Sequence, residues 1–226
     1  MQAAISDTLA INLESFSVAV INWFLINGRN YPWRQTSNPF HILIAEVLLR
    51  MTGAWKVERP YYVLVSKYAS PKDMVGADIT ELEKLFLPLG LHHRAGLLVS
   101  ISEELVKRFD GKVPGSYDDL VGVKGIGKYT ANSILCLAFG QKLPLVDSSI
   151  SRLFRRCFNF STGKAAYADK KLWQLLQNIL PDSGFREFNL GLLDIAAIHC
   201  KYPKPDCISC PLAKMCLAHS SMLAGG

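Results

Sequence analysis

Four of the six cysteines lie within eighteen residues, in the segment "HCKYPKPDCISCPLAKMC" at 199–216. Cys200, Cys207, Cys210 and Cys216 are separated by six, two and five residues. Structural zinc sites usually combine two short knuckles, whereas the four thiolates of an iron–sulfur cluster accept wider and uneven spacing. The spacing therefore favours a [4Fe-4S] cluster, with zinc and disulfides as the alternatives.

The beginning of the chain bears on the oxidation state of these thiols. The segment "MQAAISDTLAINLES" has no basic start and no unbroken apolar core, so it does not resemble a signal peptide. We expect a cytoplasmic protein, nucleoid-associated if bacterial or archaeal, whose thiols stay reduced and whose clustered cysteines bind metal. The other two cysteines, Cys136 and Cys157, lie in apolar helical patterns, and we interpret them as core thiols.

Two acidic residues are candidates for catalysis. Asp147, in "PLVDSSISRLFRR", stands at the expected start of a helix, where an ordinary N-cap is the alternative. Glu46 is the only charged residue in "ILIAEVLL". It could form an ordinary helical pair with Arg50, or it could be a partly buried carboxyl suited to proton donation.

A glycine-rich segment, "LVGVKGIGKYTAN" at 120–132, could bind phosphate. A nucleotide-binding P-loop is disfavoured because Tyr129 stands where that motif needs Ser or Thr. The segment fits a tight hairpin between two helices better. There Gly125 and Gly127 would allow positive φ and a close backbone approach to a phosphate, and the next helix would add its positive dipole end. A helix-turn-helix corner without a ligand is the alternative.

The composition limits the classes of partner. The chain has 226 residues, a formal net charge of +6 and 50% apolar residues, yet no apolar run is long enough for a membrane span. The basic balance favours a polyanionic partner, although a cluster bound by four thiolates would lower the charge by about two units.

Helical periodicity dominates the chain, and few segments alternate at period two, so we predict an all-α protein. The expected helices lie at 11–27, 39–50, 60–68, 79–87, 94–109, 116–121, 128–139, 148–158, 168–180 and 186–199.

Taken together, these features resemble the helix-hairpin-helix DNA glycosylases of the endonuclease III type that carry an iron–sulfur cluster. The likeness rests on the hairpin "VKGIGKYTA", Asp147 and the cysteine spacing. "YPWR" at 31–34, "ILIAEVLLRMT" and "FNLGLLDIAAIHC" resemble the mismatch-specific branch, and within it the thymine/uracil glycosylases. The resemblance implies a two-lobed fold, with a barrel-like six-helix domain at 29–141 that contains the hairpin. Residues 1–28 and 142–226 would form the cluster domain.

The resemblance also implies catalytic roles. The enzyme would flip a thymine or uracil mispaired with guanine and hydrolyse its N-glycosidic bond. Asp147 would stabilise the cationic sugar and orient water, and Glu46 would line the base pocket. Bifunctional relatives have a lysine where this chain has Tyr129, and a phenol cannot form a Schiff base. We therefore expect a monofunctional enzyme that leaves an abasic site.

One alternative function is an adenine-DNA glycosylase, which would act on adenine opposite guanine or 8-oxoguanine. Another is a protein that binds mismatched DNA but does not catalyse base release. Adenine-specific relatives tend to have Gln-Gln where this chain has Arg50 and Met51. They also carry an additional C-terminal domain, whereas this chain stops ten residues after Cys216. Both differences favour thymine or uracil.

Mismatched double-stranded DNA is the expected partner of a monomeric protein. We expect Gly125, Gly127 and Lys128 on a phosphate, and Lys201 and Lys204 presented to DNA by a structural, non-catalytic cluster. The loop "LGLHHRA" would supply the intercalating wedge. The remaining DNA-contact candidates are Arg50, Met51, Leu91 and His92.

Overall fold

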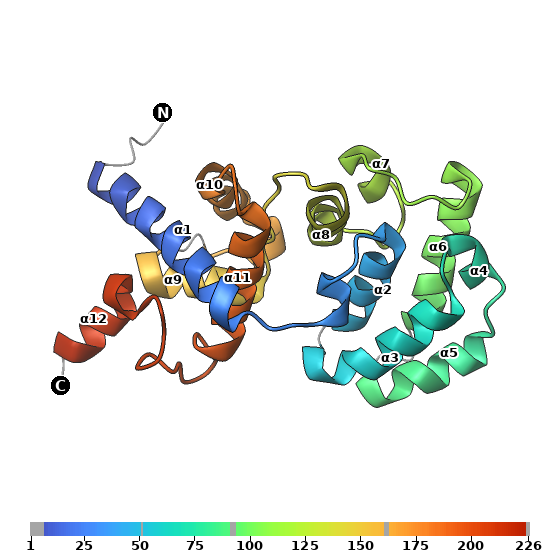
Figure 1. Cartoon of the computed structure of the whole chain (residues 1–226), viewed down its shortest axis with the longest axis horizontal. Helices are drawn as coiled ribbons and strands as arrows, with labels where there is room; N and C mark the ends of the chain where they lie inside the picture. Colours follow the sequence, from blue (N-terminus) through green and yellow to red (C-terminus); the bar gives the residue numbers. More distant parts are fainter. Residues whose placement is uncertain (1–6, 51, 91–93, 161–162, 225–226) are drawn as a thin grey trace. The chain divides into compact units, whose positions relative to one another are not determined.

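A computed structural model describes residues 7–50, 52–90, 94–160 and 163–224 (Figure 1). All regular elements in these ranges are helices, which confirms the all-α prediction. By their internal contacts the residues divide into two compact units, 30–141 and 1–29 with 142–226. None of the described helices combines the length and apolar character that a membrane span requires.

The unit at 30–141 is organised around helix α2, Pro39–Leu49. Asn38 caps this helix by accepting from the amides of Phe40 and His41, and residues 40 and 42–48 are all buried. A helix that is buried on every side must be covered by neighbours, and α2 packs against both α3 and α8. The other elements of this unit are η1 (Pro32–Arg34), α3 (Ala54–Lys67), α4 (Pro71–Val75), α5 (Ile79–Phe86), η2 (Leu87–Leu89), α6 (Ala95–Phe109), α7 (Tyr117–Val121) and α8 (Lys128–Phe139).

Helix α3 differs from its prediction. The helical pattern predicted a helix at 60–68. The helix instead begins at Ala54 and continues through Pro60. The buried stripe of Val57, Pro60, Tyr61 and Leu64 has helical spacing across the proline, so packing overrides the lost backbone hydrogen bond.

The second unit joins the two ends of the chain. Helix α1, Asp7–Asn27, packs along α11, Phe185–Ile198 (Figure 1). The contact is close at Gly191, where a Cβ atom would lie 2.8 Å from Cγ1 of Val20. The remaining elements are α9 (Ser148–Phe158), η4 (Ala166–Ala168), α10 (Lys170–Ile179), η5 (Ala213–Met215) and α12 (Leu217–Ala224).

Aromatic and ionic contacts hold this unit together. The Phe16 ring makes edge-on contacts with the rings of Phe154 and Phe188, at centroid distances of 5.7 and 6.2 Å. Asp194, which is fully buried, accepts from the Arg29 amide and guanidinium at 2.8 and 2.6 Å. These bonds make Asp194 a buried polar contact within this unit. Breaking such a buried pair is expected to destabilise strongly.

Candidate active site and DNA interface

The hairpin connects α7 to α8. Gly125 has φ +100°, and a Cβ atom there would lie 2.7 Å from Cδ1 of Leu97, so glycine is required both by the backbone and by packing. Gly127, in contrast, has φ −91° and ψ 173°, an extended conformation that any residue adopts, so the expected positive φ is wrong at this position. Nothing lies within 4 Å of a Cβ atom built on Gly127, which leaves the N-terminus of α8 open on that side.

Two residues with predicted roles lie at the start of α8. One is expected to contact a phosphate, and the other stands where bifunctional relatives have their lysine. Lys128 is exposed and Tyr129 is half-buried, directly after the Gly127 N-cap. This end of the twelve-residue helix has the positive pole of the dipole. The arrangement can hold a phosphate by backbone amides and a nearby cation.

Glu46 lies at the interface between α2 and α8. Only 9% of this residue is exposed, and its Oε1 accepts a hydrogen bond of 2.5 Å from the hydroxyl of Ser133, which is fully buried. The sequence analysis missed Ser133. Its position on α8 is separated from Glu46 by 87 residues, and a lone serine in an apolar helix gave no signal of this contact.

Arg50 follows α2, and its guanidinium reaches the hairpin. Nη2 donates to the Gly125 carbonyl at 2.7 Å and lies 3.3 Å from Oγ1 of Thr130. Arg94 in turn donates to the Arg50 carbonyl at 2.5 Å. Arg50 therefore braces the segment from which we expected DNA contacts. Three further expected DNA-contact residues, Met51, Leu91 and His92, lie outside the described residues.

Asp147 is the N-cap of α9 in the other unit. Its Oδ1 accepts from the Ile150 amide at 2.8 Å and from the Ser149 hydroxyl at 2.7 Å. The preceding segment is anchored because Asn189 accepts from the Leu145 amide at 3.0 Å. Capping is thus confirmed, and it leaves a half-buried carboxylate in a defined orientation.

The four clustered cysteines line a single pocket of about 370 Å³, counting its opening to solvent. All are free thiols, so the disulfide alternative does not apply to this structure. Among the described residues, no group of three or more Cys, His, Asp or Glu side chains is arranged to hold one metal ion. Four thiols that line one pocket are the donor type that a zinc ion or an iron–sulfur cluster uses.

Cys157, which we had interpreted as an ordinary core thiol, also lines this pocket. A hydrogen bond from Cys157 lowers the pKa of Cys216 to about 6, whereas burial raises the pKa of Cys210 to about 11. The thiolate is the form that binds metal. Burial also raises the pKa of Cys207, so it is the sulfur donors of the four cysteines in one pocket, and not their thiol pKa values, that fit a thiolate-bound metal group.

Two arginines of α9 hold the loop between Cys200 and Cys207. Arg156 donates to the carbonyls of Lys201 and Pro203 at 2.7 and 3.3 Å and lies 3.4 Å from the Cys200 sulfur. Arg152 donates to the Cys200 carbonyl at 2.7 Å. The sequence analysis overlooked both arginines, although their spacing of four residues on one helix face could have indicated a shared target.

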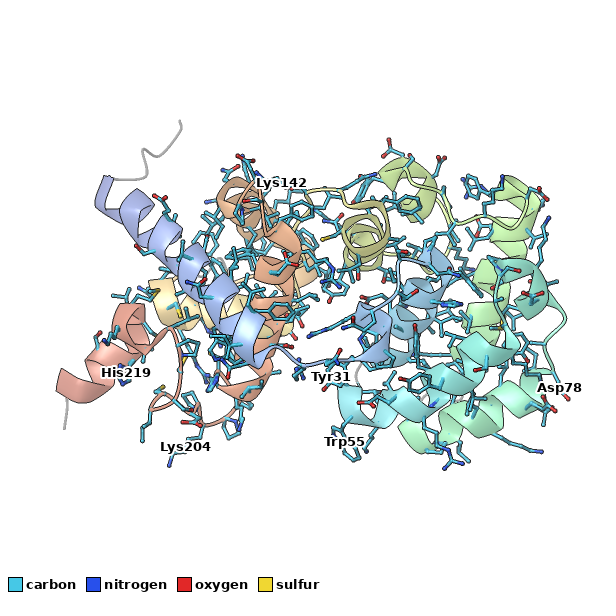
Figure 2. All side chains as sticks on the ribbon, viewed as in Figure 1. Tyr31, Trp55, Asp78, Lys142, Lys204 and His219 are labelled. Carbon is cyan, nitrogen blue, oxygen red and sulfur yellow. The ribbon has the colours of Figure 1, made fainter. Side chains whose placement is uncertain are left out.

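The lysines of this loop are exposed. Lys201 and Lys204 are both accessible, and Figure 2 shows Lys204 projecting away from the ribbon. The exposed Ser209 links the two ends of the loop, with its hydroxyl 3.1 Å from Nδ1 of His199 and 3.0 Å from Oδ2 of Asp206. The loop can therefore present two cations from a rigid base.

Similarity to known proteins extends over most of the chain. The helix-hairpin-helix motif family matches residues 108–137. A thymine/uracil-DNA glycosylase of Methanothermobacter thermautotrophicus is 35% identical over 202 residues, which cover 89% of this chain and 91% of that protein. The chain belongs to the helix-hairpin-helix DNA glycosylases, in their mismatch-specific branch.

Further relatives agree with this assignment. The solved structure of a thermostable thymine-DNA glycosylase matches with a TM-score of 0.88 at 33% identity, over 95% of this glycosylase and 100% of that chain. An endonuclease III–DNA complex, 24% identical with a TM-score of 0.82 over 95% and 98% of the two chains, shares the fold. An adenine DNA glycosylase of Buchnera aphidicola subsp. Schizaphis graminum is 30% identical, over 90% of this chain and 59% of that protein. The predicted family, the all-α helix-hairpin-helix glycosylase fold and the DNA N-glycosylase activity are confirmed.

Proposed function

We propose that this glycosylase removes thymine or uracil mispaired with guanine and leaves an abasic site. The observation that carries the proposal is the 35% identity with a thymine/uracil-DNA glycosylase over nearly the full length of both chains. The proposed substrate is double-stranded DNA, and the proposed working form is a monomer. Flipping the target base costs least at a mispair, which favours mismatched over paired bases.

Asp147 is the proposed catalytic carboxylate. Loss of the base leaves positive charge on the sugar, and a carboxylate held nearby stabilises that charge most where water is excluded. The bonds from Ile150 and Ser149 hold one carboxylate oxygen, so the side chain need not be reoriented during the reaction. The same carboxylate can orient the attacking water.

Glu46 is the proposed base-pocket residue. As a largely buried carboxyl it can hydrogen-bond the flipped base or give it a proton as it departs. Tyr129 occupies the position at which bifunctional enzymes have a lysine. Because a phenol cannot attack C1′ to form an imine, the proposed enzyme has no strong abasic-site lyase activity.

The DNA contacts proposed for this enzyme come from two surfaces. The backbone of Gly125 and Gly127, with Lys128, would hold a phosphate. The loop with Lys201 and Lys204 would contact other phosphates. Cys200, Cys207, Cys210 and Cys216 would bind a [4Fe-4S] cluster, which would supply a covalent cross-link of this loop and no chemistry at the base.

The test is base release from labelled duplexes that contain G:T, G:U, G:A or 8-oxoguanine:A, with and without hot alkali. We expect strand breaks in the G:T and G:U duplexes only after alkali. Breaks without alkali would show a lyase and contradict the role given to Tyr129. Release of adenine alone would support the second candidate, adenine glycosylase activity, which the 30% identity with an adenine DNA glycosylase favours.

A further inference from the structure

Glu46 and Ser133 form a buried polar pair between α2 and α8, next to the buried Thr130 and to several apolar residues. Its neighbours on α8, Ala131, Ile134 and Leu135, are all fully buried. A carboxylate in such surroundings requires hydrogen-bond donors, because burying a charge without them is strongly unfavourable. The Ser133 hydroxyl supplies one at 2.5 Å.

A buried helical serine does not need such a partner. Ser102, also fully buried, donates to the Leu98 carbonyl of its own helix at 2.9 Å, the usual local solution. Ser133 instead bonds across the interface to a different helix. The Ser133 hydroxyl therefore satisfies its own hydrogen-bonding requirement and also supplies a donor to the Glu46 carboxylate.

A second contact fixes the register of the two helices beside this pair. Arg50 lies four residues after Glu46, and Thr130 lies three residues before Ser133, and the Arg50 guanidinium is 3.3 Å from the Thr130 hydroxyl. Arg50 is the C-cap of α2, directly after the helical turn that begins at Glu46, and Thr130 and Ser133 share a face of α8. Two adjacent side-chain contacts thus hold α2 and α8 in one register, and the first of them holds the carboxyl of Glu46.

We propose that Ser133 is a positioning residue for Glu46. The Ser133 hydroxyl orients the Glu46 carboxyl and stays hydrogen-bonded to that carboxyl in both of its protonation states. A hydroxyl donates to a carboxylate and accepts from a carboxylic acid. The same contact therefore persists when Glu46 gains or gives a proton. This inference rests on the proposed role of Glu46 at the flipped base.

The first experiment compares Ser133→Ala, Ser133→Thr and the control Ser102→Ala with the full-length wild type. We expect Ser133→Ala to lower the single-turnover rate of base release by roughly 10- to 100-fold while affinity for the mismatched duplex changes less than about twofold. Ser133→Thr keeps the hydroxyl and should recover most of the rate. Ser102→Ala should leave the rate unchanged.

A double-mutant cycle separates positioning from general packing. If Ser133 acts through Glu46, Ser133→Ala should lower the rate no further in a Glu46→Gln background. An equal loss in both backgrounds, or a wild-type rate in Ser133→Ala, would overturn the inference.

A spectroscopic measurement keeps the inference testable apart from the reaction. With the glutamate side-chain carboxyls labelled with carbon-13, the Glu46 signal is identified by its loss in Glu46→Gln. Ser133→Ala should shift that signal, and Ser102→Ala should not. An unmoved signal would refute the contact. Failure of wild-type protein to release any base, with the signal shifted as expected, would instead refute the proposed function alone.

Discussion

At the scale of single residues, Asp147 shows how one side chain serves structure and chemistry together. The carboxylate caps α9 through the Ile150 amide, and the same bond sets the direction in which its charge acts. An asparagine caps a helix about as well as an aspartate but carries no charge. The two roles can therefore be separated by a single substitution.

We expect Asp147→Asn to keep the fold and mismatch binding while base release falls by several orders of magnitude, because the charge that stabilises the cationic sugar is lost. Single-turnover kinetics and duplex binding measure both effects. Asp78→Asn is the matched control, since Asp78 caps α5 by accepting from the amides of Thr80 and Glu81. Near-normal turnover in Asp147→Asn would show that Asp147 acts only as the N-cap of α9.

Tyr129 allows a second prediction at this scale. In Tyr129→Lys, we expect strand cleavage at the released site to appear without alkali, because an amine then stands where an imine can form. Trapping with borohydride would detect the covalent intermediate. Tyr129→Phe should still need alkali, and cleavage by that variant would point to another amine.

At the scale of elements, the two glycines of the hairpin differ in what their positions require. Gly125 is held at positive φ against Leu97, whereas Gly127 is extended and faces open space. Only the first position is restricted by backbone conformation.

We expect Gly125→Ala to lower the free energy of unfolding by about 1–3 kcal/mol and to weaken DNA binding, because the left-handed backbone and the Leu97 contact both oppose a Cβ atom. Gly127→Ala should fold with a stability within about 0.5 kcal/mol of wild type. Thermal or denaturant unfolding measures both. Equal stabilities for the two variants would contradict the assigned difference.

The loop between Cys200 and Cys207, which would carry ligands of the proposed cluster, is a second element with a separable support. Arg156 contacts the carbonyls of Lys201 and Pro203, so Arg156→Gln should loosen the loop and speed the loss of iron to a chelator. Iron content and the visible absorbance of the purified protein report this change. Arg155→Gln, on the neighbouring position of α9, is the control and should retain iron like the wild type. Colourless, active wild-type protein that contains zinc would overturn the cluster itself.

At the scale of the whole molecule, the formal charge of +6 and the proposed phosphate contacts make binding electrostatic. With about five phosphates neutralised, a fourfold rise in salt should weaken duplex binding by roughly 10²–10³. Lys128→Ala should reduce the salt slope by about one, whereas Lys72→Ala, which removes a lysine paired with Asp110, should not. A flat salt response would count against the DNA contacts.

Local patterns by themselves determined much of this protein. The predicted helices at 128–139 and 148–158 have the bounds of α8 and α9, because helical periodicity and caps such as Asp147 are properties of neighbouring residues. The spacing of the four cysteines likewise sufficed to predict that they share one site, and all four line one pocket.

Tertiary structure alone decided the contacts between residues far apart in the chain. Ser133 meets Glu46 across 87 residues, Arg156 reaches a loop 45 residues away, and Cys157 joins the pocket of the clustered cysteines. Each of these side chains lies in a helix whose own pattern explains it as core or surface. Which helices pack together depends on how the apolar surface of the whole chain is buried, and the pattern within one helix does not specify its packing partners.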